Sequence, residues 1–400
     1  MNPGNNHTSS TDHNNLRAEL TRLTLAGVIA LLLAGWLLST QTGATDAVLY
    51  LLASIALWLL VCQQSYSRLA LNRADDTSPL YPELGWANRM TVGRGWLIAA
   101  TGGFLVLPEA LNAQAPLLWT AAALYSVAAI LDRTDGFVAR RTGQTTLLGA
   151  RLDTVFDALG LLVAPLLALQ HDKIHASYLL VSVAYYLFVL GIRFREKQQL
   201  PVYPLAPSLL RRSLAGFQMG YIAVVLWPPF KAEVTVPAGF GFMLPLLAGF
   251  LVDWLVVSGR LMPQQGINAW FRHVHDMTRR WLLPLLRAAL AVTAVLVASR
   301  LDPVVSAPPL MALDTLRALD TLMALNTLLA LGVLMMVLGL AGRAGAIMVL
   351  MLLAWAVPLP VMSTAFIVIM TTTIAILLLG CGRFSLWQVD DDWVNRQDGA

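Results

Sequence analysis

The sequence predicts an all-α polytopic membrane protein. Of its 400 residues, 57% are hydrophobic and only 12% are charged, which is far from the composition of a typical soluble domain. Apolar runs of near twenty residues recur along the chain and are separated by polar turns. A helix needs about that length to cross a bilayer, so the runs favour membrane-spanning helices over a barrel.

Twelve spans are expected. In chain order they lie near residues 23–41, 47–66, 94–108, 115–131, 152–170, 175–193, 212–230, 238–259, 281–299, 322–341, 344–358 and 362–380. The first two form an N-terminal hairpin, the next six form a core, and the last four form a C-terminal module.

The N-terminal region is expected to hold a tail and a membrane anchor. Residues 1–17 are rich in Asn, Ser, Thr and His, a composition typical of a disordered tail. The apolar run that follows is too long for a signal peptide, so we interpret it as a retained anchor. The hairpin and a polar loop then occupy residues 18–85. Cys62 and Cys381 are isolated in the sequence, which favours inert packing over disulfide or metal chemistry.

Basic residues predict the orientation. They gather before the first span and in alternate loops, whereas the loops near residues 107–116, 173 and 231 hold one basic residue at most. By the positive-inside rule, both termini and the turn near residue 140 face the cytoplasm. The net charge of +4 comes largely from these loops and indicates an anionic lipid leaflet as the partner, not nucleic acid.

Four acidic residues at the edge of two spans stand out. Asp132 and Asp135 end one apolar run, and Asp153 and Asp157 lie at the start of the next. Charge at the edge of a span is costly and usually marks a functional site. Spacings of three and four residues place each pair on one helix face, so two helices that meet at a turn can aim all four carboxylates into one pocket.

The residue types around these acids indicate phosphoryl-type chemistry. Carboxylate oxygens suit Mg²⁺ or Mn²⁺. Gly136, Ala139 and Gly149 leave room for a ligand near the backbone, and Arg140 carries a planar fork suited to phosphate. The alternative is a set of structural ion pairs with nearby arginines. These are Arg133, Arg140, Arg141 and Arg151.

The pattern D-x2-D-G-x2-A-R-x8-G-x3-D-x3-D, from Asp132 to Asp157, resembles the signature of the CDP-alcohol phosphatidyltransferase family. All eight fixed positions, spread over 26 residues, are filled. The resemblance implies a six-helix domain over residues 86–262. It also implies an enzyme of phospholipid biosynthesis that moves a phosphatidyl group from a CDP-activated lipid, usually CDP-diacylglycerol, to an alcohol and releases CMP.

The resemblance also implies roles for the signature residues. Asp132, Asp135 and Asp153 would hold metal, with Asp157 beside a second ion and acting as the base for the acceptor hydroxyl. The CDP site would be lined by Gly136, Ala139, Arg140 and Gly149. The segment from Trp86 to Arg94 resembles the family's P-N-x-x-T-x-x-R, with Ala87 in place of proline. This resemblance adds Asn88, Thr91 and Arg94 to the CDP-binding candidates, whereas an interfacial anchoring role for Arg89 and Arg94 is the alternative.

The acceptor alcohol stays open. A phosphorylated acceptor would need further basic residues on the cytoplasmic side. Arg193, Arg195, Lys197, Arg211 and Arg212 offer that charge, although the positive-inside rule explains them equally well. The expected partners are therefore the CDP-lipid, a small alcohol and membrane lipid, without nucleic acid. A homodimer is an open option, and the expected location is the inner (cytoplasmic) membrane.

The C-terminal half is expected to hold a linker, a module and a tail. Residues 263–280 mix aromatic and basic side chains, as in an interfacial amphipathic helix. Residues 281–387 resemble DoxX-like four-helix membrane domains through Gly380-Cys-Gly-Arg-Phe-Ser-Leu386 and Gly342-Arg-Ala-Gly345. An acidic tail follows at 388–400.

A rival from another class is a transporter or non-catalytic scaffold that uses the acids as an ion path. That function would favour acids distributed over several spans. Here the acids concentrate at one turn, and Asp253 is the main other acid within a span.

Overall fold

The computed structural model describes residues 4–205, 209–261, 276–300, 313–356, 363–382 and 384–387. These residues form helices together with one isolated β-bridge between Leu340 and Trp387, so the predicted all-α class is confirmed. Twelve long helices coincide in order with the twelve expected spans, and a short one is added between the third and the fourth. The order is α1 (Gly4–Thr42), α2 (Ala44–Tyr66), α3 (Gly85–Gly102), α4 (Pro108–Ala113), α5 (Ala115–Arg141), α6 (Leu147–Gln170), α7 (Leu179–Lys197), α8 (Leu209–Val225), α9 (Ala232–Val257), α11 (Leu283–Arg300), α12 (Leu313–Leu338), α13 (Gly342–Ala356) and α14 (Thr364–Leu379).

Seven stretches in the described residues are long and apolar enough to cross a membrane. They cover all or most of α1, α2, α5, α6, α7, α9 and α11, and the apolar parts of α8, α12, α13 and α14 are shorter. The protein is therefore a multi-pass membrane protein. The expected third span, near 94–108, overlaps α3, which begins at Gly85 and carries polar side chains such as Asn88 and Arg94. Helix α3 is not among the described helices that are apolar enough to cross a membrane. Likewise α1 includes residues 4–17, which the sequence assigned to a tail.

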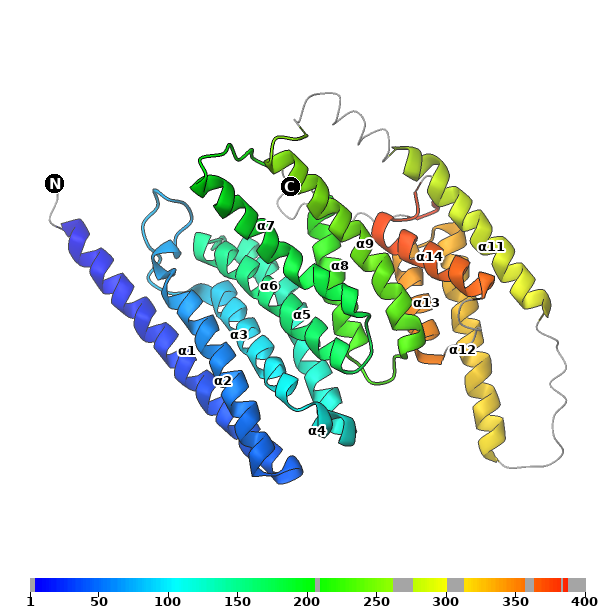
Figure 1. The fold of residues 1–400 in the computed structure, drawn as a ribbon, viewed down its shortest axis with the longest axis horizontal. Coiled ribbons are helices and arrows are strands. Elements are labelled where there is room, and N and C mark those ends of the chain that lie inside the picture. Colours follow the sequence, from blue (N-terminus) through cyan, green and yellow to red (C-terminus); the bar gives the residue numbers. More distant parts are fainter. Residues whose placement is uncertain are drawn as a thin grey trace. The chain divides into compact units, whose positions relative to one another are not determined.

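The chain forms two compact units. The first comprises residues 4–187 and 218–228 and holds α1 to α6. In it α1 packs on α2, α2 on α3, and α3 on both α5 and α6, a succession that runs from blue to cyan in Figure 1. The core of this unit centres on Trp58, Ile98, Leu152 and Phe156, each at most 2% exposed. Helix α3 thus lies between the hairpin and the helices that carry the acidic motif.

Close helix packing shapes the hairpin. A Cβ on Gly27 would lie 2.6 Å from the ring of Trp58, and one on Gly35 would lie 2.6 Å from Leu51. Small residues let helices approach closely where lipid offers no hydrophobic drive for association. The Trp58 indole also donates a hydrogen bond to Thr24 O at 3.1 Å. The hairpin is therefore a tightly packed pair.

The loop between α2 and α3 is ordered by its own polar groups. Asp75 accepts hydrogen bonds from the hydroxyl and amide groups of Thr77 and Ser78. The bond from the Thr77 hydroxyl is the main reason why the pKa of the Asp75 carboxyl lies well below its usual range. Asn72, at the start of the loop, is fully buried. The loop is thus a defined element between hairpin and core.

The second unit comprises residues 188–217 and 229–387 where the structure describes them. Within it α11 contacts α12 and α14, and α13 contacts α12 and α14. Buried Arg287 of α11 donates hydrogen bonds to Val337 O, Cys381 O and Phe384 O, which ties three segments of the module together. Most of the predicted linker and the tail 388–400 lie outside the described residues, and the DoxX-like resemblance stays a prediction.

Candidate active site

Two helices bring the signature acids together. Helix α5 continues through Asp132 and Asp135 and ends at Arg141. Arg140 and Arg141 lie in its last turn. Gly143, with φ +67°, reverses the chain. Helix α6 then begins at Leu147, and its N-cap Thr146 accepts a hydrogen bond from Gly149 N at 2.9 Å. The short turn therefore joins two helices whose acidic faces can meet.

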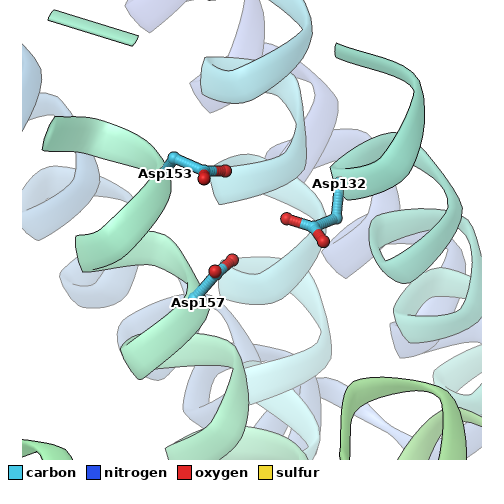
Figure 2. Close-up of side chains that lie close together, drawn as sticks. All are labelled: Asp132, Asp153 and Asp157. Atoms are coloured by element: carbon cyan, nitrogen blue, oxygen red, sulfur yellow. The ribbon is translucent and has the colours of Figure 1, made fainter. Parts of the chain in front are cut away.

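Three of the four acids converge. One carboxylate oxygen each from Asp132, Asp153 and Asp157 lies within 4.8 Å of the others. Figure 2 shows Asp132 pointing from α5 toward the pair on α6, where Asp153 and Asp157 are one turn apart. Their side chains are 24%, 47% and 34% exposed, respectively, so the cluster is recessed but can be reached by a ligand.

Arg94 lies among these three carboxylates. Its side chain is 0% exposed and forms ion pairs with Asp132, with Asp153 at 2.9 Å and with Asp157 at 3.1 Å. The sequence made Arg94 a candidate for CDP binding, and that role stays a prediction. The structure adds that Arg94, from α3, holds the acids of α5 and α6 against one another.

Asp135 occupies a separate position one turn after Asp132. Its side chain is buried, and its Oδ2 accepts a hydrogen bond from the Thr91 hydroxyl of α3 at 2.8 Å. Asp135 is therefore not part of the group of three that converges. The structure pairs Thr91, a candidate for CDP binding, with this fourth acid.

Asn88 and Gly149 are in close contact. A Cβ on Gly149 would lie 2.7 Å from Asn88 Oδ1, so the glycine of the signature makes room for the asparagine of α3. Asn88 is buried, and its amide is engaged by Asn72, Leu84 O and Thr146. These protein partners already occupy the amide group that the sequence assigned to CDP binding.

The remaining signature residues lie on the last turns of α5. Ala139 is half-buried and Arg140 is exposed. A Cβ on Gly136 would lie 3.2 Å from Arg140 Nη1, so the glycine lets the guanidinium lie close to the helix. The arrangement leaves small residues and one basic group beside the carboxylates.

The acceptor-site candidates belong to the other unit. Arg193 is exposed, whereas Arg195 donates hydrogen bonds to Pro201 O and Ser258 O. The side chains of Arg211 and Arg212 are outside the described part of the chain. The acceptor role of all four stays a prediction.

Tyr125 of α5 was not among the site residues predicted from the sequence. It precedes Asp132 by seven residues, so both lie on the same face of α5. Its ring packs at the position of Gly160 in α6, where a Cβ would lie 3.6 Å from Cε2. The Tyr125 hydroxyl is buried without a hydrogen-bond partner in the described residues. The seven-residue spacing from Asp132 is the signal that could have indicated it.

The donor set fits a hard divalent cation. When ionised, three carboxylates and the single guanidinium of Arg94 leave a surplus of negative charge, and carboxylate oxygen is the ligand that Mg²⁺ and Mn²⁺ prefer. Asp157 Oδ1 is buried and forms its ion pair with Arg94 Nη1 at 3.1 Å, so an ion bound there would share this carboxylate with the guanidinium. Asp132, Asp153 and Asp157 are therefore the residues that would hold the ion.

Comparison with known proteins gives one result. Residues 84–254 match the family model described as CDP-alcohol phosphatidyltransferase. No curated protein and no solved structure was found to match. The matched residues include α3, the signature on α5 and α6, and all three converging acids. Residues 84–254 of the chain are therefore similar to the CDP-alcohol phosphatidyltransferase family.

Proposed function

We propose that the protein is a metal-dependent enzyme of phospholipid biosynthesis. It transfers a phosphatidyl group from a CDP-activated lipid, CDP-diacylglycerol, to an alcohol and releases CMP. The observation that carries this proposal is the convergence of Asp132, Asp153 and Asp157 from two helices inside the family-matched region. A family match alone would indicate only transfer from a CDP-alcohol.

The reaction forms one phosphorus–oxygen bond and breaks another. The acceptor hydroxyl oxygen attacks the phosphatidyl phosphorus, and the bond from this phosphorus to the bridging oxygen breaks. The bridging oxygen leaves with CMP. Asp157 takes the proton of the acceptor hydroxyl as general base. Mg²⁺ or Mn²⁺, expected as two ions and held by the signature acids, would supply Lewis-acid neutralisation of the diphosphate charge.

The other residues of the site orient the acids or bind the nucleotide. Arg94 keeps the three acids of α5 and α6 at a common point. Arg140, exposed at the end of α5, offers a fork for a phosphate group of the nucleotide. Gly136 and Ala139 keep the side chains small beside the carboxylates, where the CDP moiety would bind, whereas Gly149 makes room for Asn88.

The membrane setting fits a lipid donor. The turn between α5 and α6, residues 142–146, is called the motif turn. It lies near Arg140, Arg141 and Arg151, and basic residues favour the cytoplasmic side of a membrane. We therefore propose an active site at the cytoplasmic face of the inner membrane. Acyl chains stay in the bilayer there, while the nucleotide and the alcohol arrive from water.

The direct test uses purified full-length protein with labelled CDP-diacylglycerol, Mg²⁺ or Mn²⁺ and a panel of alcohols. We expect CMP release that requires the metal and one class of acceptor. Asp157→Asn should lower the rate by about 10²- to 10⁴-fold, because the general base is lost.

Asp172→Asn is the matched control. Asp172 is exposed in the loop after α6 with φ +55°, a conformation that Asn tolerates, so its rate should equal that of the wild type. Unchanged CMP release by Asp157→Asn would refute the assigned base. Absence of release with every donor and acceptor would favour a transporter or scaffold. The same panel names the acceptor and shows whether Arg193 and Arg195 affect its binding.

A further inference from the structure

The family-matched segment is connected to the loop that follows the hairpin by a chain of buried and partly buried hydrogen bonds. Asn72 lies outside the matched residues, at the start of the loop between α2 and α3. Its Nδ2 donates to Glu83 O at 2.8 Å, and its backbone O accepts from Tyr81 N at 2.9 Å. Because Asn72 is 0% exposed, the bond to Glu83 O fixes its side chain and the bond from Tyr81 N fixes its backbone.

The chain continues into the core. Asn88 Nδ2 donates to Asn72 Oδ1 at 2.9 Å, and Asn88 Oδ1 accepts from the Thr146 hydroxyl at 3.1 Å. The Thr146 hydroxyl in turn accepts from Gly149 N at 2.9 Å as the N-cap of α6. Three side chains therefore link the loop to the first turn of the helix that carries Asp153 and Asp157.

Two further contacts join the same parts. Leu147 N donates to Arg73 O at 2.9 Å, so the residue after Asn72 bonds directly to the start of α6. Tyr81 of the loop and Gln144 of the motif turn line one cavity of about 370 Å³. At the other end of the loop, Glu19 of α1 accepts from Leu84 N at 3.0 Å and pairs with Arg89 of α3 at 2.5 Å.

We infer that this hydrogen-bond chain positions the metal-binding end of α6. Its positioning residues are Asn72, from outside the matched residues, and Thr146, at a position that the signature leaves unspecified. The inference rests on the proposed function. Buried polar groups that lose a partner leave the others unsatisfied. Loss of either residue should therefore shift the first turns of α6, and with them Asp153, away from Asp132.

Metal binding provides a measurement that is independent of catalysis. Full-length protein in detergent is titrated with Mn²⁺, and the free ion is followed by electron paramagnetic resonance. We expect Asn72→Ala to weaken Mn²⁺ binding by about 10- to 100-fold, the effect typical of residues that orient metal ligands. Asn112→Ala is the matched control. It removes a hydrogen bond to His171 in the same unit and should leave binding unchanged.

A second pair of variants separates positioning from folding. Thr146→Val keeps the shape of the side chain and removes the hydroxyl, whereas Thr146→Ser keeps the hydroxyl. We expect Thr146→Val to weaken Mn²⁺ binding and Thr146→Ser to bind like the wild type. This pair decides the question if Asn72→Ala does not fold.

The outcomes are distinct. If the wild-type protein binds Mn²⁺ and releases CMP, and the variants of Asn72 and Thr146 bind Mn²⁺ equally well, the positioning role is overturned. The proposed function then still stands. Equal weakening by Thr146→Ser and Thr146→Val would overturn the role of the hydroxyl. Wild-type protein that neither binds Mn²⁺ nor releases CMP would overturn both proposals.

Discussion

At the scale of single residues, Arg94 is the unusual member of the site. It is fully buried, and its ion pairs extend to acids on two other helices. Burial of a charge is costly unless partners compensate for it. The same reasoning applies to the acids, whose mutual repulsion Arg94 offsets. The stability of the site and its capacity for metal are therefore coupled through this guanidinium.

Replacement of Arg94 should make the protein depend on metal for stability. Arg94→Ala leaves the carboxylates uncompensated and should lower the free energy of unfolding by about 3–5 kcal/mol. Because a divalent cation can then neutralise them, added Mn²⁺ should raise the melting temperature of Arg94→Ala more than that of the wild type. Thermal unfolding in detergent with and without Mn²⁺ measures both effects.

Arg22→Ala serves as the control, because Arg22 is exposed on α1 and its loss should change stability by no more than about 0.5 kcal/mol. An Arg94→Ala variant as stable as the wild type would contradict the coupling.

The sequence predicted the positions of the acids better than it predicted the residues that contact them. Spacing indicated that each pair of acids shares a helix face and that all four can meet across the turn. The structure brings Asp132, Asp153 and Asp157 together, whereas Asp135 binds Thr91 instead. Spacing did not indicate that Arg94 lies between the three acids or that Thr91 binds Asp135, because those contacts depend on how α3 packs against α5 and α6. Tertiary packing of separate helices is not encoded in local spacing.

At the scale of elements, the hairpin illustrates how glycine sets helix separation. Gly27→Val would place side-chain atoms where the Trp58 ring now lies, since a Cβ alone would come within 2.6 Å of it. We expect a loss of about 1–3 kcal/mol in the free energy of unfolding, as for other overpacked sites.

Ala26→Val adds similar bulk at the neighbouring exposed position and should be close to neutral. Denaturant unfolding of the two variants in detergent compares them. Equal stability would show that α1 and α2 can separate without cost.

Element boundaries were only partly predictable. Apolar runs located the helices, but hydrophobicity does not mark where a helix continues beyond the bilayer. Helix α5 therefore extends to Arg141, ten residues past the expected end of its span, and α3 begins at Gly85 among polar residues. In each case backbone hydrogen bonds continue through residues whose side chains are charged or polar.

At the scale of the whole molecule, the family match covers less than half of the chain, residues 84–254. The chain also folds as two compact units, and the matched segment contributes to both. The three converging acids all belong to the first unit, which also contains the hairpin. The family-matched segment and the compact units of the fold thus do not coincide.

The proposed orientation can be tested by labelling single cysteines in intact cells. Thr142→Cys, in the motif turn, should react with a membrane-impermeant reagent only after permeabilisation. Ala113→Cys, exposed at the end of α4 just before α5 begins, should react before it. Native Cys62 and Cys381 are buried and should give little background. The reverse pattern would place the carboxylates on the outer face.

The position of the acids along α6 has a consequence for the host membrane. At about 1.5 Å per residue, Asp153 and Asp157 lie roughly 9 and 15 Å from the first residue of that helix. This spacing is rigid, whereas bilayer thickness differs among lipid mixtures. Vesicles of shorter or longer acyl chains would therefore raise or lower the phosphate layer relative to a fixed catalytic plane, so turnover should pass through an optimum as chain length varies.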